Sequence, residues 1–206
     1  MPMPRTLRFG APIALLLAAS PAFAASSADP LWPCIQPKVA TLAAGQMWAG
    51  PPIENLKWRE DRQVADVVPL LIARRVPLEQ ADALIGDFAQ QAGAQKKERL
   101  TLLFAGVFDE INALRTRILT GIERYSKHQI ALSDRIKDES LALAKAKKAA
   151  TTDDEKAKAA DMEKQVLWDT RIYDTRAQAV TAVCESPVIL EQRAFALART
   201  IQGAME

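Results

Sequence analysis

The fold is decided by residues 95–148, whose sequence reads QKKERLTLLFAGVFDEINALRTRILTGIERYSKHQIALSDRIKDESLALAKAKK. This stretch contains no proline, and only Gly106 and Gly121 interrupt it. Its apolar residues recur in alternating steps of three and four, which is the spacing of a heptad seam. They are Leu100, Leu103, Phe104, Val107, Phe108, Ile111, Leu114, Ile118, Ile122, Tyr125, Leu132, Ile136 and Leu143. We expect one helix about 80 Å long, which a compact domain is too small to cover.

A connector and a return helix are predicted to follow. Thr152 or Asp153 can cap the returning helix, and the acidic residues of 153–155 suit its positive N-terminus. This helix should run to about Cys184. If the chain turns near Thr151, residue numbers paired across the two helices sum to roughly 302. Cys184 should then lie level with about Ile118.

The proximal part of the long helix needs other partners, because the return helix does not reach it. One helical pattern runs over about 58–75, with Pro69 inside it; either the helix bends there or a new helix begins with Asp66 as its N-cap. Pro77 should open another helix that stops at Gly93. Ser186-Pro187 is typical of the start of a separate last helix, ending at Gly203.

The sequence therefore predicts an all-α fold: a helical bundle base from which a long antiparallel coiled-coil hairpin projects. We call residues 58–118 and 184–206 the base and residues 119–183 the hairpin. Residues 25–57 form a proline- and tryptophan-rich extended arm. Within the arm, a short helix is expected over Pro37–Ala44. The hairpin seam could also pair between chains, which would make a homo-oligomer.

Residues 1–24 have the features of a cleaved Sec signal peptide. Arg5 and Arg8 are its basic region, residues 11–19 its apolar region, and Ala24 the last residue of a small-x-small cleavage site. The apolar run is too short to span a bilayer, so we expect no membrane insertion after cleavage. We expect a periplasmic or secreted protein.

Charge excludes one class of partner. The chain has 27 basic and 25 acidic residues, and two of the basic ones lie in the signal peptide. The processed chain would therefore be neutral. A neutral chain has no electrostatic footprint for nucleic acid, so no nucleic-acid partner is expected.

Cys34 and Cys184 are the chain's two cysteines. In an oxidising compartment they are expected to form one disulfide, which would fasten the arm where the hairpin leaves the base. A redox-active pair is the alternative, but there is no Cys-x-x-Cys spacing. Trp32, Trp48 and Trp58 are candidate partner-binding residues, although the favoured interpretation is that the arm buries its tryptophans against its own protein.

No constellation in the sequence indicates catalysis. The single histidine, His128, has no nucleophile or acid near it in sequence, and residues 153–155 lack the glycine and alternating ligands of a calcium loop. We therefore expect no catalytic residues, no metal site and no cofactor. The leading hypothesis is a non-catalytic structural or interaction protein that presents the hairpin to another envelope protein. A holdase-type chaperone or envelope-stress sensor is the alternative, and an enzyme or small-ligand carrier ranks last.

Overall fold

The computed structural model describes residues 29–206, so the predicted signal peptide lies outside the described residues. All regular structure in this range is helical, and the fold is an all-α hairpin as predicted. Four α-helices follow the arm: α1 (Arg62–Ile72), α2 (Leu78–Ala92), α3 (Lys96–Ala149) and α4 (Asp153–Met205). Three short 3-10 helices accompany them, at Ala44–Gln46, Trp58–Glu60 and Gly93–Gln95.

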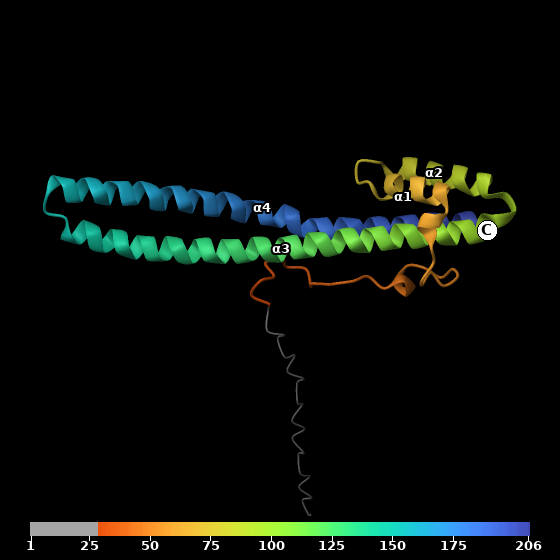
Figure 1. Ribbon diagram of the computed structural model, residues 1–206, viewed down its shortest axis with the longest axis horizontal. Helices are drawn as coiled ribbons and strands as arrows, with labels where there is room; N and C mark the ends of the chain where they lie inside the picture. Colours follow the sequence, from red (N-terminus) through yellow and green to blue (C-terminus); the bar gives the residue numbers. More distant parts are fainter. Residues whose placement is uncertain (1–28) are drawn as a thin grey trace, which may run out of the picture.

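Figure 1 shows α3 and α4 side by side and antiparallel over nearly their whole length. Helices α1 and α2 lie together at one end, close to the C-terminus, and the other end holds only the turn between α3 and α4. Helix α3 has 54 residues, so it is about 80 Å long at 1.5 Å per residue. The predicted long helix and its return are both present.

The turn between the long helices is fixed by local hydrogen bonds. Thr152 is the N-cap of α4, and its side chain accepts a hydrogen bond from the backbone N–H of Glu155. The carboxylate of Glu155 in return accepts hydrogen bonds from the backbone N–H groups of Thr151 and Thr152, at 2.8 and 2.9 Å. These bonds, those from Thr152 above all, lower the pKa of Glu155 to about 2. This capping box confirms the turn and the cap predicted from the sequence.

The register of the hairpin also agrees with the prediction. The side chain of Gln129 donates a hydrogen bond to the carbonyl of Tyr173, and these two numbers sum to 302. Closer to the turn, Arg135 of α3 forms a 2.7 Å ion pair with the buried carboxylate of Asp169 of α4. A shifted register would leave the buried carboxylate of Asp169 without its cation, so this ion pair favours a single register of the two helices.

The main hydrophobic cluster lies at the end where α1 and α2 lie. Its buried residues come from the arm, Trp58, helices α1 and α2, the first part of α3 and the last part of α4. Gly106 allows α1 and Trp58 to pack closely on α3, because a Cβ there would lie 2.7 Å from Val68 and 2.9 Å from the ring of Trp58. The sequence suggested an interruption at this glycine, but it is a packing position within a continuous helix.

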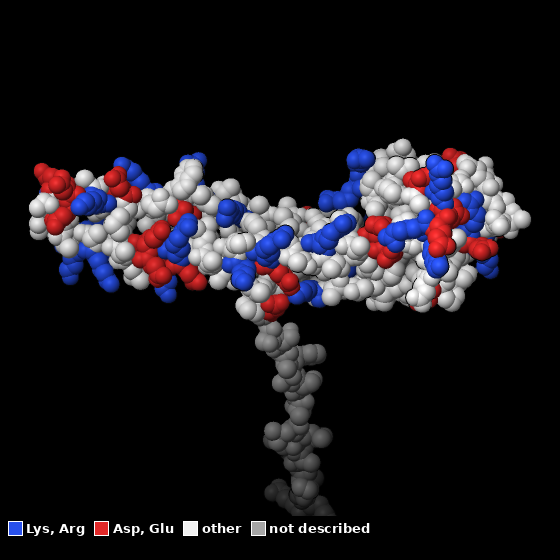
Figure 2. All heavy atoms as spheres, viewed as in Figure 1, with Lys and Arg blue, Asp and Glu red and all other residues white. Residues whose placement is uncertain are grey.

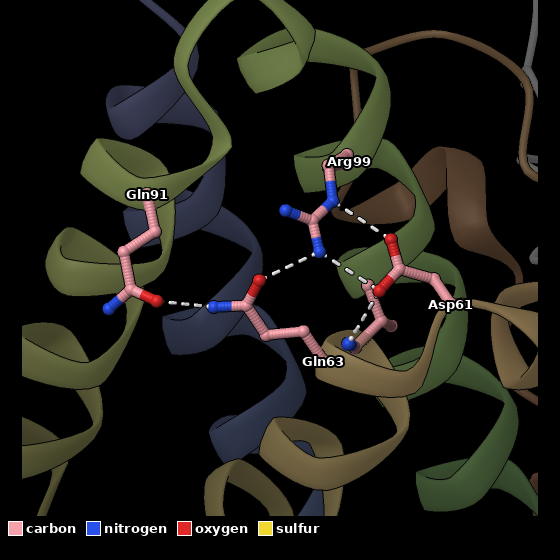
Figure 3. A network of polar contacts seen from close by, with 5 residues as sticks. Asp61, Gln63, Gln91 and Arg99 are labelled. Carbon is pink, nitrogen blue, oxygen red and sulfur yellow. Dashed lines mark hydrogen bonds and ion pairs between the residues drawn. The ribbon is translucent and has the colours of Figure 1, made fainter.

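A polar network ties α1 to α2 and α3 beside this core (Figure 3). Arg99 donates two hydrogen bonds to the carboxylate of Asp61, at 2.8 and 2.9 Å, and one to the side chain of Gln63 at 2.9 Å. Gln63 in turn donates to Gln91. Asp61 also caps α1 by accepting from the N–H of Val64. The Arg99 guanidinium holds the pKa of Asp61 below its usual value, and the network orients three helices.

Helix α1 differs from its prediction at both ends. It begins at Arg62 and ends at Ile72, and the N-cap is Asp61, whereas one alternative placed Asp66 there. Pro69 lies inside this one continuous helix. Helix α2 follows the prediction, with Pro77 as its N-cap and Gly93 as its C-cap at φ +53°, in the left-handed region that favours glycine.

Two further predictions of helices were wrong. Residues 37–43 form no helix, because the backbone is held extended by Asn112, whose side chain accepts from the N–H of Leu42 at 2.9 Å and donates to its carbonyl at 3.5 Å. No separate last helix begins at Pro187, since α4 runs through it to Met205. The proline removes one backbone donor, but Cys184, Pro187 and Leu190 are buried, so packing holds the helix together.

Candidate binding site at the root of the hairpin

The arm is joined to α4 by the predicted disulfide. Cys34 and Cys184 are bonded, with 5.5 Å between their Cα atoms and 150 residues between them in sequence. The bridge lies where the core ends, and Leu119 lines the same cavity as Cys184, close to the predicted level of Ile118. Such a bond fits an exported protein.

Ion pairs and a backbone pairing hold the arm against α3 on either side of the bridge. Lys38 pairs with Glu123 of α3, and at 3.5 Å with Asp29 of the arm itself. The hydrogen bond to Glu123 is the main cause that raises the pKa of Lys38. Farther along, Asn112 holds the backbone of Leu42. This part of the arm therefore runs alongside α3 in a fixed position (Figure 1).

The three tryptophans proposed for partner binding differ in exposure. Trp48 is 7% exposed and stacks on Phe104 with 4.1 Å between ring centroids. Trp58 is 6% exposed, and its indole N–H donates to Asp109 at 3.2 Å. Both rings belong to the core, so they offer a partner almost no surface. Trp32 is half-buried, and its N–H donates to the carbonyl of Gln36 at 2.7 Å.

Arg115 of α3 lies beneath the arm as a buried cation. Its side chain is 3% exposed. Nε donates to the carbonyl of Pro187 at 3.3 Å, and Nη2 lies 3.4 Å from the carbonyl of Val39 and 3.5 Å from a carboxylate oxygen of Glu191. Nη1 has no hydrogen-bond partner within the described range. Burial lowers the pKa of Arg115, against a smaller opposing effect of Glu191.

A cavity of about 570 Å³ opens beside this arginine. It is bounded by the arm on one side and by α3 and α4 on the other, and the disulfide lies in its wall. The lining residues are Trp32, Gln36, Pro37, Val39, Arg115, Leu119, Cys184, Pro187, Val188, Glu191, Gln192, Phe195 and Arg199. Apolar side chains therefore surround a small number of charged groups, as in many small-molecule sites.

A second exposed feature lies on the hairpin. Leu167 and Trp168 of α4 are 64% and 60% exposed. Trp168 borders a cavity of about 450 Å³ together with Arg171, Ile172, Thr175 and Arg176. The sequence pattern does not single out Trp168 for partner binding. A signal for it exists, since Val166 and Tyr173 of the return helix are seven residues apart, in heptad phase, and Trp168 lies out of that phase.

Charge along the hairpin is mixed. Figure 2 shows basic and acidic side chains interspersed over the face in view, with neither sign covering it.

No helix in the described range 29–206 is both long and apolar enough to cross a membrane. His128 is exposed on α3, and residues 29–206 contain no group of three or more His, Cys, Asp or Glu side chains placed to hold a metal ion.

The geometry thus contains two candidate binding features, the cavity at the hairpin root and the Trp168 surface, which we define as Leu167, Trp168, Arg171 and Arg176. Neither holds the paired acid, base and nucleophile of a hydrolytic site. Comparison with protein-family models, with curated proteins and with solved structures finds no match to this chain.

Proposed function

We propose that this is an exported, non-catalytic interaction protein that presents its hairpin to another protein of the cell envelope, in the periplasm. The observation that supports it most is the division of the chain between core and hairpin. The fully buried residues of the core stop at Ile111 on α3, with Leu114 and Ile118 still packed against them, and resume at Leu190 on α4. Most residues between Ile118 and Leu190 add length without adding to that core, and a self-contained domain has no need of this length.

The Trp168 surface indicates where such a partner would contact the hairpin. An exposed tryptophan beside a leucine offers a large apolar area, and aromatic residues and arginine are enriched at the centres of protein interfaces. Arg171 and Arg176 border the same surface. We therefore expect a partner surface that combines apolar side chains with carboxylates.

Site-specific crosslinking in cells tests this proposal. A photoreactive benzoylphenylalanine at Trp168 should give a discrete crosslinked product, whereas the same group at the exposed Glu79 of α2 should not. Trp168→Ala should abolish capture of that product by a crosslinker at Leu167. Identical products from positions 168 and 79 would contradict the proposal, and a product of twice the chain's mass would identify a second copy as the partner.

A shortened hairpin gives the matching functional test. Residues 137–164 can be replaced by a four-residue turn, because the cut ends lie opposite each other and the core, the disulfide and the Trp168 surface remain. Partner capture at Trp168 should persist if this surface alone is recognised, and it should fall if the tip contributes. Replacing Leu167, Arg171 and Arg176 by alanine around the same crosslinker should remove all capture, and an unchanged product from that variant would refute the proposal.

Export is tested by the state of the cysteines. The full chain should appear in the periplasmic fraction with Cys34 and Cys184 resistant to alkylation. A chain that lacks residues 2–24 should remain in the cytoplasm with both thiols reactive. Reactive thiols in the full chain would contradict this part of the proposal.

The chaperone alternative depends on an open apolar groove in the base, formed by Phe88, Phe104 and Phe108. Phe88 and Phe104 are buried in the core, and only Phe108 is partly exposed. Because two of the three rings have no free surface, the hairpin-presenting function has the stronger support.

A further inference from the structure

The cavity at the hairpin root contains a cation that its own protein compensates only in part. A buried guanidinium without a close carboxylate is costly, because burial removes the water that would otherwise solvate the charge. The nearest carboxylate, on Glu191, is 3.5 Å away, and its side chain is 36% exposed. The remaining contacts of Arg115 are long hydrogen bonds to the carbonyls of Pro187 and Val39. Nη1 has none within the part of the chain described.

The charges and shape of the cavity select a class of ligand. Among the lining residues, Arg115 and Arg199 are positively charged and Glu191 is negatively charged, so the lining has one net positive charge. A singly charged anion matches this balance, whereas a phosphate dianion would exceed it and would lie close to Glu191. Apolar side chains surround the charge, and the volume of about 570 Å³ is within the range of small-molecule pockets. A guanidinium is also a strong partner for a carboxylate through charge-assisted hydrogen bonds.

We infer that the cavity at the hairpin root binds a carboxylate attached to an apolar body, with Arg115 as its counter-ion and Arg199 at the rim. The apolar body lies against Val188 and Phe195 of α4 and against Trp32 of the arm. This site goes beyond the proposed function, since it involves neither the Trp168 surface nor the hairpin tip. The carboxylate can belong to a free small acid or to the C-terminus of a peptide.

The disulfide makes the site dependent on oxidation. Trp32, Gln36, Pro37 and Val39 are all arm residues, and they form one wall of the cavity. Cys34 fastens this wall to α4 through Cys184. Reduction frees the wall, so the reduced protein should lose the site while α3 and α4 keep Arg115 in place.

Calorimetric titration of the full oxidised chain tests the inference. The probes are 4-phenylbutyrate and a pentapeptide ending in phenylalanine, each compared with its neutral amide. At least one carboxylate should bind with one-to-one stoichiometry and at least tenfold more tightly than its amide. Whichever acid binds identifies the source, either a small molecule or a peptide terminus. Reduction with dithiothreitol should abolish binding.

Variants separate the site from the general charge of the protein. Arg199→Gln should weaken binding severalfold, and Gln192→Trp, which places a large ring at an exposed wall position, should block it. Arg117→Gln removes the same charge from the exposed face of α3 outside the cavity and should leave the affinity unchanged. Arg115 is buried, so Arg115→Gln also affects folding, and the variants of Arg199 and Gln192 are the ones that test the site. The inference is overturned if neither acid binds saturably, if acid and amide bind equally, or if Gln192→Trp binds like the wild type.

Discussion

Removing the disulfide is expected to lower the free energy of unfolding by about 5 kcal/mol. The bridge joins residues 150 apart, and the loop-closure entropy of a ring of this size corresponds to about 5 kcal/mol at 25 °C. The double variant Cys34→Ala with Cys184→Ala makes the change. Alanine is preferable to serine, because Cys184 is buried and a hydroxyl there would lack a hydrogen-bond partner.

The folded state should change only where the arm depends on the bridge. Leu42 remains paired with Asn112, and Trp48 remains stacked on Phe104. The residues before Leu42 keep only the ion pair of Lys38 with Glu123 and the contact of Val39 with Arg115. Residues 29–41 should therefore become more mobile, seen as sharper, averaged backbone NMR signals, while the amides of α3 and α4 retain their protection from hydrogen exchange.

Guanidinium unfolding followed by far-ultraviolet circular dichroism measures the effect. Three samples are compared: oxidised wild type, reduced wild type and the double alanine variant. The last two should agree and should lie well below the first. They should also show a larger m value, because an unfolded chain without the cross-link exposes more surface. A loss below about 1 kcal/mol would refute the loop-entropy reasoning, and so would a collapse of helix content in the absence of denaturant.

Gly106→Ala should destabilise the protein by about 1–3 kcal/mol in urea unfolding, because the new methyl group overlaps Trp58 and Val68. Gly86→Ala is its control; its Cβ meets nothing within 4 Å, so a gain of up to about 1 kcal/mol is expected, and equal losses would contradict the packing argument. Asp61→Asn should cost about 1–2 kcal/mol at neutral pH. Because the folded pKa of Asp61 is lowered by Arg99, the stabilisation is full above the unfolded pKa, and the difference from wild type should disappear as pH falls below about 4 towards the folded value. A difference that persists in acid would refute this. The carboxylate of Glu155 should titrate by NMR with a pKa of about 2; the support it gives the turn is therefore lost only as pH falls towards that value, and a midpoint near about 4 would exclude the capping box. Arg135→Gln, which leaves Asp169 buried without its 2.7 Å partner, should destabilise the hairpin by on the order of 2 kcal/mol, seen as faster hydrogen exchange near residue 169 with an unchanged base.

The features that could be predicted from sequence are those with local causes. The seam from Leu100 to Leu143 determines α3 through repeated spacing alone, and Thr152 with Glu155 forms the turn within four residues. The disulfide followed from the number of cysteines and the expected compartment. The helix and the turn require no knowledge of distant contacts, and the disulfide could be predicted across 150 residues because the chain has only two cysteines to pair.

The errors arose where a distant residue decides the local structure. Residues 37–43 carry a helix-start signal, but Asn112 of α3 pairs with the backbone of Leu42 and favours an extended chain. Pro187 normally favours a helix start, yet packing against α3 keeps α4 continuous. Arg115 was overlooked because it is charged. It nevertheless follows Ile111 by four residues and precedes Leu119 by four, and all three are buried.

The capping box at the tip has a consequence for the order of folding. Contacts near the turn close loops of only a few residues, such as Thr151 with Glu155, whereas the core requires contacts such as Arg193 with Leu71 across 122 residues. Because closing a short loop costs less chain entropy, the pairing of α3 and α4 should start at the turn and zip towards the base. The end that carries most of the buried apolar surface would then be the last to assemble.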